Sequence, residues 1–392
     1  MVRKRSGPGQ RRLGPRWPLP PALAALGFRR FVTGLLVLVL TGVVGVLGLL
    51  VAWSPGRPAP VTDSAGQPLP GSISERVFIP VNGLRQGMII RAADNANPVL
   101  LFLHGGPGLP EYFLDTTHPT GLEQDFTVVW WEQRGTGLSF GRDIPPETMT
   151  LEQFIADAVA VADTLRERFK QEKIYLLAHS WGSYLGIQVA AAAPDRFHAY
   201  VGMGQVSHQL RSEIAAQRYL MDVYRVRGDL AMVRRLEAAP VSMDDGTSDA
   251  WLRLRDRAMH RVGVGTTRRM RSVITGVALP LWRCRTYTLR EKLNIWRGLS
   301  LSRRFLWDDF LRTDLTTRVG RLNLPVYFLF GAHDYTANHE LAREYFERMS
   351  APVKGFYTFR GSAHSPLFEE PSYAREVLSR DVLTGGIELT DR

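Results

Sequence analysis

Three residues spread along the chain, Ser180, Asp334 and His364, are of the types that together make an activated nucleophile. A serine hydroxyl is a weak nucleophile at neutral pH, so it needs a base within hydrogen-bond reach, and an acid must orient that base. Each of the three follows an apolar run, namely IYLLAH, VYFLFGAH and GFYTFRGSA. The combination predicts acyl transfer, in which His364 takes the proton of Ser180 while Asp334 orients the imidazole. This chemistry requires no metal and no organic cofactor.

The surroundings of Ser180 predict a sharp turn. A buried strand should end at His179, and a helix should open near Gly182. A serine on such a turn is a nucleophile elbow, which needs small neighbours because strand and helix backbones approach closely. Gly182 is one small neighbour, and Ala178 stands where a glycine is usual. The alternative is an ordinary serine that caps a helix.

Donors for a developing oxyanion are predicted on both sides of the elbow. One is the backbone N–H of Trp181, which follows the serine. The segment HGGPGLPE, which begins at His104, supplies the other, because its consecutive glycines Gly105 and Gly106 expose backbone N–H groups. The alternative for this segment is a simple Gly-Pro turn.

Other titratable residues lie close to the three in sequence. We interpret His179 as packing within the elbow and His333 as part of a loop. Glu369 and Glu370 follow His364 closely, and we interpret them as the opening turn of the last helix, where negative charge suits the helix dipole.

The positions of these residues depend on a predicted α/β fold. From about Glu75, short apolar runs alternate with longer amphipathic stretches such as Leu151 to Phe169, which is the pattern of strands and helices around a mostly parallel sheet. Residues 206–318 are Arg-rich and helical in pattern, with no convincing strand. We therefore predict a core over residues 75–205 and 319–392, with a helical cap over residues 206–318 inserted between two sheet strands.

The formal charge of +11 does not indicate a nucleic-acid-binding protein. Eight basic residues lie before residue 31, and the remaining 41 basic and 38 acidic residues leave the rest of the chain near neutrality. Nucleic-acid binding needs a concentrated basic surface on the folded domain. The single cysteine, Cys284, excludes an intramolecular disulfide.

The apolar run Phe31 to Trp53 predicts a transmembrane helix, because it carries no charge and is long enough to cross a bilayer. A cleaved signal peptide is the alternative, but the run is long and VAWSPG fits a cleavage site poorly. Positive flanks stay cytoplasmic, so we expect a single-pass protein of the cell membrane with a cytoplasmic tail over residues 1–30. A Pro/Gly-rich linker over residues 54–74 would then hold an extracytoplasmic catalytic domain off the membrane. The sequence does not indicate an oligomeric state.

Five segments together resemble the proline iminopeptidase group of α/β-hydrolases, which are serine exopeptidases that release N-terminal residues: HGGPG, WWEQRGTGLS, HSWGS, GAHD and GSAH. The resemblance covers nearly the whole chain after the linker. It implies the α/β-hydrolase fold, the triad already named, and oxyanion donors at Gly105 or Gly106 and at Trp181. The chain departs from the family pattern at Glu132, where an aspartate is usual, and at Ala178-His179, where two glycines are usual.

The resemblance also implies cap carboxylates that hold the free α-amino group of a peptide, since an aminopeptidase must recognise a cation near the scissile bond. Among Glu213, Asp222 and Glu237 we favour Glu213, which comes early in the first cap helix. The predicted function is a membrane-anchored aminopeptidase acting on small peptides. The alternative is a carboxylic-ester, lactone or amide hydrolase with the same triad, and a catalytically silent binding protein would require that the triad residues fail to converge.

Overall fold

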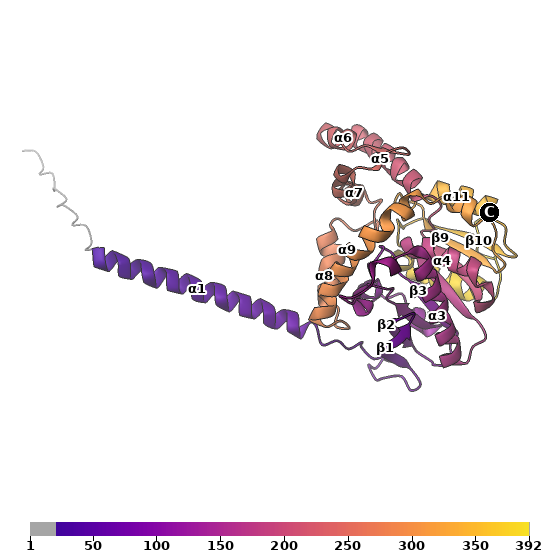
Figure 1. The fold of residues 1–392 in the computed structure, drawn as a ribbon, viewed down its shortest axis with the longest axis horizontal. Helices are drawn as coiled ribbons and strands as arrows, with labels where there is room; N and C mark the ends of the chain where they lie inside the picture. Colours follow the sequence, from indigo (N-terminus) through magenta and orange to yellow (C-terminus); the bar gives the residue numbers. More distant parts are fainter. Residues whose placement is uncertain (1–20, 392) are drawn as a thin grey trace, which may run out of the picture. The chain divides into compact units, whose positions relative to one another are not determined.

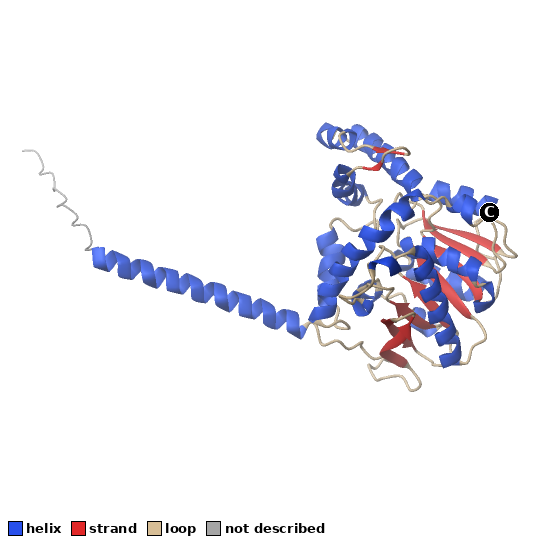
Figure 2. Ribbon diagram, in the orientation of Figure 1, coloured by secondary structure: helices blue, strands red, loops and turns tan. Residues whose placement is uncertain are grey.

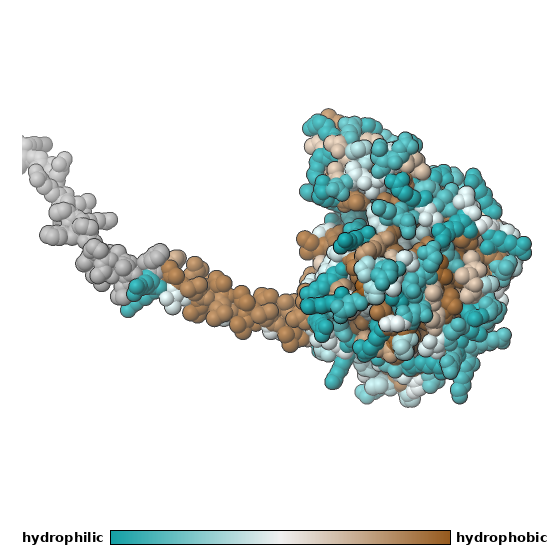
Figure 3. Space-filling view, in the orientation of Figure 1, coloured by the Kyte–Doolittle hydropathy of each residue, from teal (hydrophilic) through white to brown (hydrophobic). Residues whose placement is uncertain are grey.

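The computed structural model describes residues 21–391, which comprise an N-terminal helix and a compact domain that begins at Trp53. Helix α1 spans Pro21–Ala52, and the surface of its apolar part is visible in Figure 3. The window Arg29–Ala52 has a mean hydropathy of 2.9 with none of it buried, so by length and composition it can cross a membrane. Residues 1–20 of the predicted basic tail lie outside the described residues.

The domain is built on a mostly parallel sheet with strand order β1-β2-β4-β3-β5-β6-β9-β10 (Figures 1 and 2). β1 and β2 form an antiparallel hairpin, β2 also pairs antiparallel with β4, and the other neighbours are parallel. The predicted opening hairpin and buried strands are confirmed. The strands of this sheet are β1 Ile73–Val81, β2 Leu84–Ala92, β3 Val99–Leu103, β4 Thr127–Trp131, β5 Ile174–His179, β6 Phe197–Met203, β9 Val326–Gly331 and β10 Lys354–Phe359.

Helices cover both faces of the sheet. The helices that follow α1 are α2 Tyr112–Thr117, α3 Leu151–Phe169, α4 Trp181–Ala192, α5 Gln209–Val226, α6 Leu230–Glu237, α7 Asp249–Val262, α8 Leu279–Arg283, α9 Leu289–Arg312, α10 Leu315–Arg318, α11 His339–Arg348, α12 Pro366–Glu369 and α13 Pro371–Val377. The predicted helix over Leu151 to Phe169 is confirmed as α3, whose first turn is capped because Thr150 Oγ1 accepts from the Gln153 N–H.

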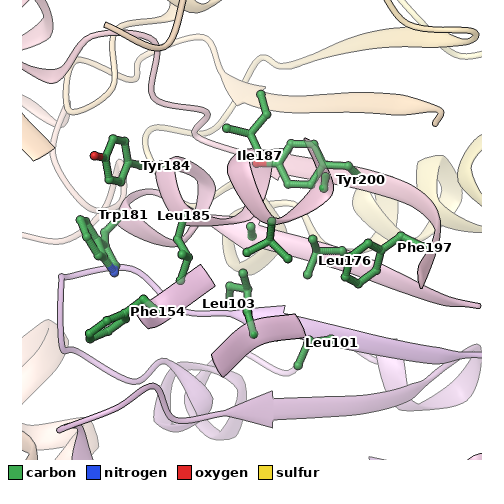
Figure 4. Close-up of a cluster of buried hydrophobic side chains, with 14 of the residues drawn as sticks. Leu101, Leu103, Phe154, Leu176, Trp181, Tyr184, Leu185, Ile187, Phe197 and Tyr200 are labelled. Atoms are coloured by element: carbon green, nitrogen blue, oxygen red, sulfur yellow. The ribbon is translucent and has the colours of Figure 1, made fainter. Parts of the chain in front are cut away.

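Two hydrophobic cores lie on opposite faces of the sheet, because side chains alternate along each strand. On β3, Leu101 and Leu103 belong to one core, while Leu100 and Phe102 belong to the other. The first core contains residues of α3 and α4, and Figure 4 shows how Trp181 and its neighbours pack within it. The second contains residues of α2, α8, α12 and α13. Fully apolar strands are therefore buried on both sides, as the sequence pattern predicted.

The region predicted as a cap, residues 206–318, packs in two different ways. Helices α5, α6 and α7 share a separate hydrophobic cluster that includes Leu220, Leu236 and Trp251, and they project beside the sheet domain in Figure 1. In contrast, α8 and α9 contribute Leu281 and Leu306 to the cores of the sheet. The region also contains the short strands β7 Val241–Ser242 and β8 Gly246–Thr247, which the sequence analysis did not predict.

The start of the predicted linker is fastened to the domain rather than extended from it. The buried ammonium of Lys292 on α9 donates to the carbonyl of Trp53 at 2.8 Å and to Ser54 Oγ at 3.0 Å. The N–H groups of Gly56 and Arg57 both donate to the carbonyl of Arg285, at 3.1 and 3.2 Å. Residues 54–57 at the start of the predicted linker therefore contact the domain, and the role of residues 54–74 as a linker stays a prediction.

Candidate active site

Ser180 lies on a strained turn between β5 and α4. Its φ of 55° and ψ of −122° fall in a region that non-glycine residues rarely adopt. Position 182, in the first turn of α4, requires glycine, because a Cβ there would lie 2.1 Å from the carbonyl oxygen of Leu103. The predicted geometry of strand, serine and helix is therefore present, and Ser180 is half-buried at the sheet edge.

Asp334 and His364 meet at the same edge of the sheet. Asp334 follows β9, His364 follows β10, and Asp334 Oδ2 lies 2.8 Å from His364 Nδ1. The other carboxylate oxygen accepts from the N–H groups of Thr336 and Ala337 at 2.8 and 3.1 Å. Burial alone would raise the pKa of Asp334, but His364 and the two backbone donors outweigh it and hold the pKa below its usual value.

The second ring nitrogen of His364 has a different environment from the first. Among the described residues, His364 Nε2 is a buried atom without a hydrogen-bond partner. Ser180 lies nearby, since its N–H donates to the carbonyl of Met203, and the next residue, Gly204, lies so close to His364 that a Cβ on it would be 2.9 Å from the imidazole ring. Hydrogen bonds between base and nucleophile are often long in free enzymes and tighten when substrate binds.

The three predicted oxyanion donors have different environments. Trp181 is the first residue of α4, where backbone N–H groups have no partner within the helix. The N–H of Gly105 donates to Glu111 Oε1 at 3.2 Å. Gly106 has a φ of 123°, which excludes most side chains, and a Cβ there would lie 2.6 Å from the nitrogen of Gly108. The geometry therefore favours Gly106 over Gly105 as the second donor.

The segment EQRG, residues 132–135, ties the glycine loop to the elbow. Gln133 Nε2 donates to the carbonyl of His104 at 2.9 Å, and Trp181 Nε1 donates to Gln133 Oε1 at 3.0 Å. Its neighbour Arg134 forms a buried, bidentate ion pair with Asp157 of α3, at 2.8 and 2.9 Å. Such a pair fixes orientation as well as supplying energy. The motif WWEQRGTGLS contains this segment, but its sequence alone does not indicate these contacts.

His179 does more than pack within the elbow. Its Nδ1 lies 2.8 Å from Glu111 Oε1, and its Nε2 lies 2.8 Å from the carbonyl oxygen of His364. The rings of His179 and His364 have centroids 4.8 Å apart. His179 is thus buried at the elbow as interpreted, and in addition its two nitrogens join the glycine loop to the loop that carries His364. His333 lies in a loop as expected, where its N–H donates to the carbonyl of Ser362.

Glu369 and Glu370 brace the loop that carries His364. Glu369 is the last residue of α12, and its Oε1 accepts from the N–H of Ala363 at 2.9 Å. Glu370 Oε2 accepts from the N–H of Gly361 and from Ser362 Oγ, at 2.9 and 2.6 Å. Both residues do lie at helix starts, Glu369 in the first turn of α12 and Glu370 at the N-cap of α13, and their side chains also turn back to the preceding loop. The only signal in the sequence was two adjacent carboxylates a few residues after the histidine.

Glu213, the predicted ligand of a substrate amine, is enclosed by other polar side chains. Its Oε2 accepts from Trp251 Nε1 and Arg255 Nε at 2.8 and 2.7 Å, and its Oε1 accepts from Gln209 Nε2 at 2.8 Å. Both oxygens are therefore in use, and Arg255 neutralises the charge. The role of Glu213 in substrate binding stays a prediction.

The described residues contain no group of three or more His, Cys, Asp or Glu side chains able to hold a metal ion. A hollow of about 660 Å³ lies away from Ser180, and it is lined by residues of α2, α8 and their neighbouring loops, including Tyr112, Asp115 and Arg283.

Comparison with known proteins places the chain among hydrolases. A family model described as the alpha/beta hydrolase fold matches residues 98–371. The chain is 33% identical over 316 residues to the protein of Bacillus subtilis (strain 168) named "Probable aminopeptidase YbaC", a match that covers 79% of this chain and 96% of that protein. It is 34% identical over 99 residues to a proline iminopeptidase of Lactobacillus acidophilus, covering 25% of this chain and 32% of that protein.

Solved structures show the same fold. A proline iminopeptidase-related protein of Thermus thermophilus superposes with a TM-score of 0.55 at 22% identity, covering 78% of this chain and 98% of that one. The proline iminopeptidase of Mycobacterium smegmatis superposes with a TM-score of 0.56 at 18% identity, covering 79% and 98%. At these identities the two structures show similarity of fold alone. The fold class predicted from the sequence is confirmed.

Proposed function

The chain belongs to the α/β-hydrolase fold family, and we propose that it is a serine hydrolase that forms an acyl-enzyme at Ser180. The observation that carries this proposal is the combination of a strained serine elbow with the 2.8 Å pair between Asp334 and His364. A nucleophile, a base and an orienting acid in this chain order are the requirements for acyl transfer on this fold.

In the proposed mechanism, His364 Nε2 takes the proton of Ser180 as the hydroxyl oxygen attacks the substrate carbonyl carbon. The backbone N–H groups of Trp181 and Gly106 hold the developing oxyanion. His364 then gives its proton to the leaving group, which yields the acyl-enzyme. Water, deprotonated by the same imidazole, releases the acyl group, while Asp334 holds the ring in one tautomer throughout.

For the substrate, we propose a small peptide with a free N-terminus. The support is the 33% identity to the Bacillus protein over 96% of its length, since that protein is named "Probable aminopeptidase YbaC". The contacts of Glu213 favour a second candidate, a hydrolase of carboxylic esters, lactones or amides, because both oxygens of the predicted anchor for a cationic amine already accept hydrogen bonds from the protein. Membrane anchoring through α1, with the catalytic domain outside the cell, is part of the proposal and is supported by the apolar window Arg29–Ala52.

The test compares hydrolysis of proline and alanine p-nitroanilides with that of p-nitrophenyl acetate and butyrate, using the full chain in detergent. Ser180→Ala serves as the control for chemistry at the elbow. Turnover of anilides that is lost when the amine is blocked, and lost in Ser180→Ala, supports an aminopeptidase. Turnover of esters alone supports the second candidate. Turnover that survives in Ser180→Ala would contradict the proposed nucleophile.

A further inference from the structure

A second pair of carboxylate and histidine lies beneath the catalytic one. Glu111 Oε1 lies 2.8 Å from His179 Nδ1, and His179 Nε2 lies 2.8 Å from the backbone carbonyl oxygen of His364. Both side chains are buried, with 7% and 3% of their surface exposed. Glu111 and His179 therefore connect the glycine loop to the backbone of His364 through successive polar contacts.

The hydrogen bonds determine where the protons lie. A carbonyl oxygen only accepts, so His179 Nε2 must carry the hydrogen that it donates to His364. Glu111 Oε1 already accepts from the Gly105 N–H at 3.2 Å, as an ionised carboxylate does. Burial alone would lower the pKa of His179, but the charge of Glu111 and its hydrogen bond outweigh burial and raise it. These contacts place a hydrogen on His179 Nε2 and direct Nδ1 at the carboxyl group of Glu111.

The pair supplies a constraint that Asp334 does not. Asp334 holds His364 through one ring atom, Nδ1, which fixes the tautomer but leaves the backbone of the loop to other contacts. His179 holds that backbone at its carbonyl and lies beside the ring, with 4.8 Å between centroids. Because His179 directly precedes Ser180, the same contact fixes the base relative to the nucleophile.

We propose that Glu111 and His179 are positioning residues, which set the distance between His364 and Ser180 by holding the backbone of the histidine loop against the elbow. This inference rests on the proposed function, since it assumes that Ser180 and His364 react together. A misplacement of roughly 1 Å in a catalytic group can cost about 10²-fold in rate, so loss of the pair should slow acylation.

The experiment measures the second-order rate of labelling by a fluorophosphonate, in which Ser180 Oγ bonds to phosphorus, fluoride leaves and the serine proton passes to His364. The probe reports on the serine and its base without knowledge of the natural substrate. The variants are Glu111→Gln, His179→Leu and His179→Gln, all in the full chain. Asp115→Asn is the matched control, because this buried carboxylate of α2 accepts from Thr120 and makes no contact with the triad.

We expect Glu111→Gln and His179→Leu to be labelled about tenfold more slowly or worse, while Asp115→Asn labels at the rate of the wild type. His179→Gln should recover part of the loss, because its amide N–H can still donate to the His364 carbonyl. With the anilide or ester that is turned over, kcat should fall more than KM rises. Thermal unfolding of each variant separates this pattern from simple misfolding, since His179→Gln and His179→Leu both lose the imidazole contact with Glu111.

Two results would overturn the inference while leaving the function intact: equal labelling rates in wild type and Glu111→Gln, or a defect confined to KM for substrates with a free amine. The latter would make Glu111 a substrate ligand, whose Oε2 is buried without a partner among the described residues. Failure of the wild type itself to label would instead contradict the proposed function.

Discussion

At the scale of single residues, the hydrogen bonds of Asp334 dictate which tautomer His364 adopts. Oδ1 is fixed by the N–H groups of Thr336 and Ala337, so the Oδ2 position must face His364 Nδ1. In Asp334→Asn the N–H groups of Thr336 and Ala337 should still donate to the side-chain oxygen. The amide NH₂ group would then face His364 Nδ1. The imidazole would be forced to accept at Nδ1 and to carry its proton on Nε2, where it cannot take the proton of Ser180.

We therefore predict that Asp334→Asn loses about 10⁴-fold in kcat, the magnitude seen when a triad aspartate is replaced by asparagine. KM should change little, because no substrate contact is removed. Steady-state kinetics with whichever chromogenic substrate is turned over checks this. A loss of less than tenfold would mean that the amide rotates against its backbone donors or that the base is another residue.

Glu132 should make stability depend on pH. Its carboxyl is buried, which raises its pKa to about 8, although hydrogen bonds from Tyr287 and the Leu138 N–H oppose the shift. Between the unfolded value of 4.5 and about 8, the folded chain holds a proton that the unfolded chain has lost. Stability from this group is therefore greatest below pH 4.5, falls as pH rises through the window, and levels above about pH 8.

Glu132→Gln should remove this contribution, since an amide does not titrate. The Tm of the wild type should thus fall relative to that of Glu132→Gln as the pH rises from 5 to 8. Each unit of pKa shift corresponds to about 1.4 kcal/mol of unfolding free energy. Thermal unfolding of the full chain in detergent across this range measures it. Parallel Tm curves for the two proteins would contradict a raised pKa.

Residues could be predicted from the sequence where the indication lies in the residues immediately around them. Ser180, Asp334 and His364 each follow an apolar strand, and strand ends of a parallel sheet meet at one edge. The contacts of His179 join residues 68 and 185 positions away, and no periodicity reports on such distances. Adjacency to Ser180 in the sequence did not indicate this contact. The side chain of His179 reaches the loop that carries His364.

At the scale of elements, strands were predictable because burial on both faces requires continuous apolar runs, and long helices because burial on one face produces a helical apolar period. The cap was predicted as one helical insertion, but only α5, α6 and α7 share a core of their own. α8 and α9 pack on the sheet, and amphipathic patterns do not reveal which partner a helix faces. Likewise, Pro- and Gly-rich composition predicted an extended linker, and composition alone does not reveal contacts such as those made by Lys292.

We predict that Lys292→Met frees residues 53–57 from the domain. The ammonium donates to the carbonyls of Trp53 and Trp282 at 2.8 and 2.7 Å and to Ser54 Oγ at 3.0 Å. Hydrogen bonds from a charged donor contribute about 1.5–3 kcal/mol each, so their loss should speed amide exchange at Gly56 and Arg57 about tenfold or more. Hydrogen exchange read by mass spectrometry measures this.

Lys354→Met is the control for this prediction. Lys354 also donates to backbone carbonyls, those of Phe346 and Met349 at 2.8 Å each, but it is the first residue of β10 and fastens that strand to the end of α11. Its loss should leave exchange at Gly56 and Arg57 unchanged. Equal protection of these two amides in Lys292→Met and wild type would show that the Arg285 carbonyl holds the segment without the lysine.

At the scale of the whole molecule, the helix and the domain should be separable at Ala52. None of the apolar window of α1 is buried, whereas from Trp53 onward the backbone is bound by the domain. Removing residues 1–52 should therefore convert a protein that resists alkaline carbonate extraction from membranes into one that is soluble, with kcat and Tm unchanged.

Removing residues 1–71 should lower Tm by a few degrees, because Lys292 then keeps a buried charge with two fewer acceptors. A full chain released by carbonate would contradict membrane anchoring. Equal Tm values for the two truncations would show that the contacts of residues 53–71 contribute nothing to the stability of the hydrolase domain.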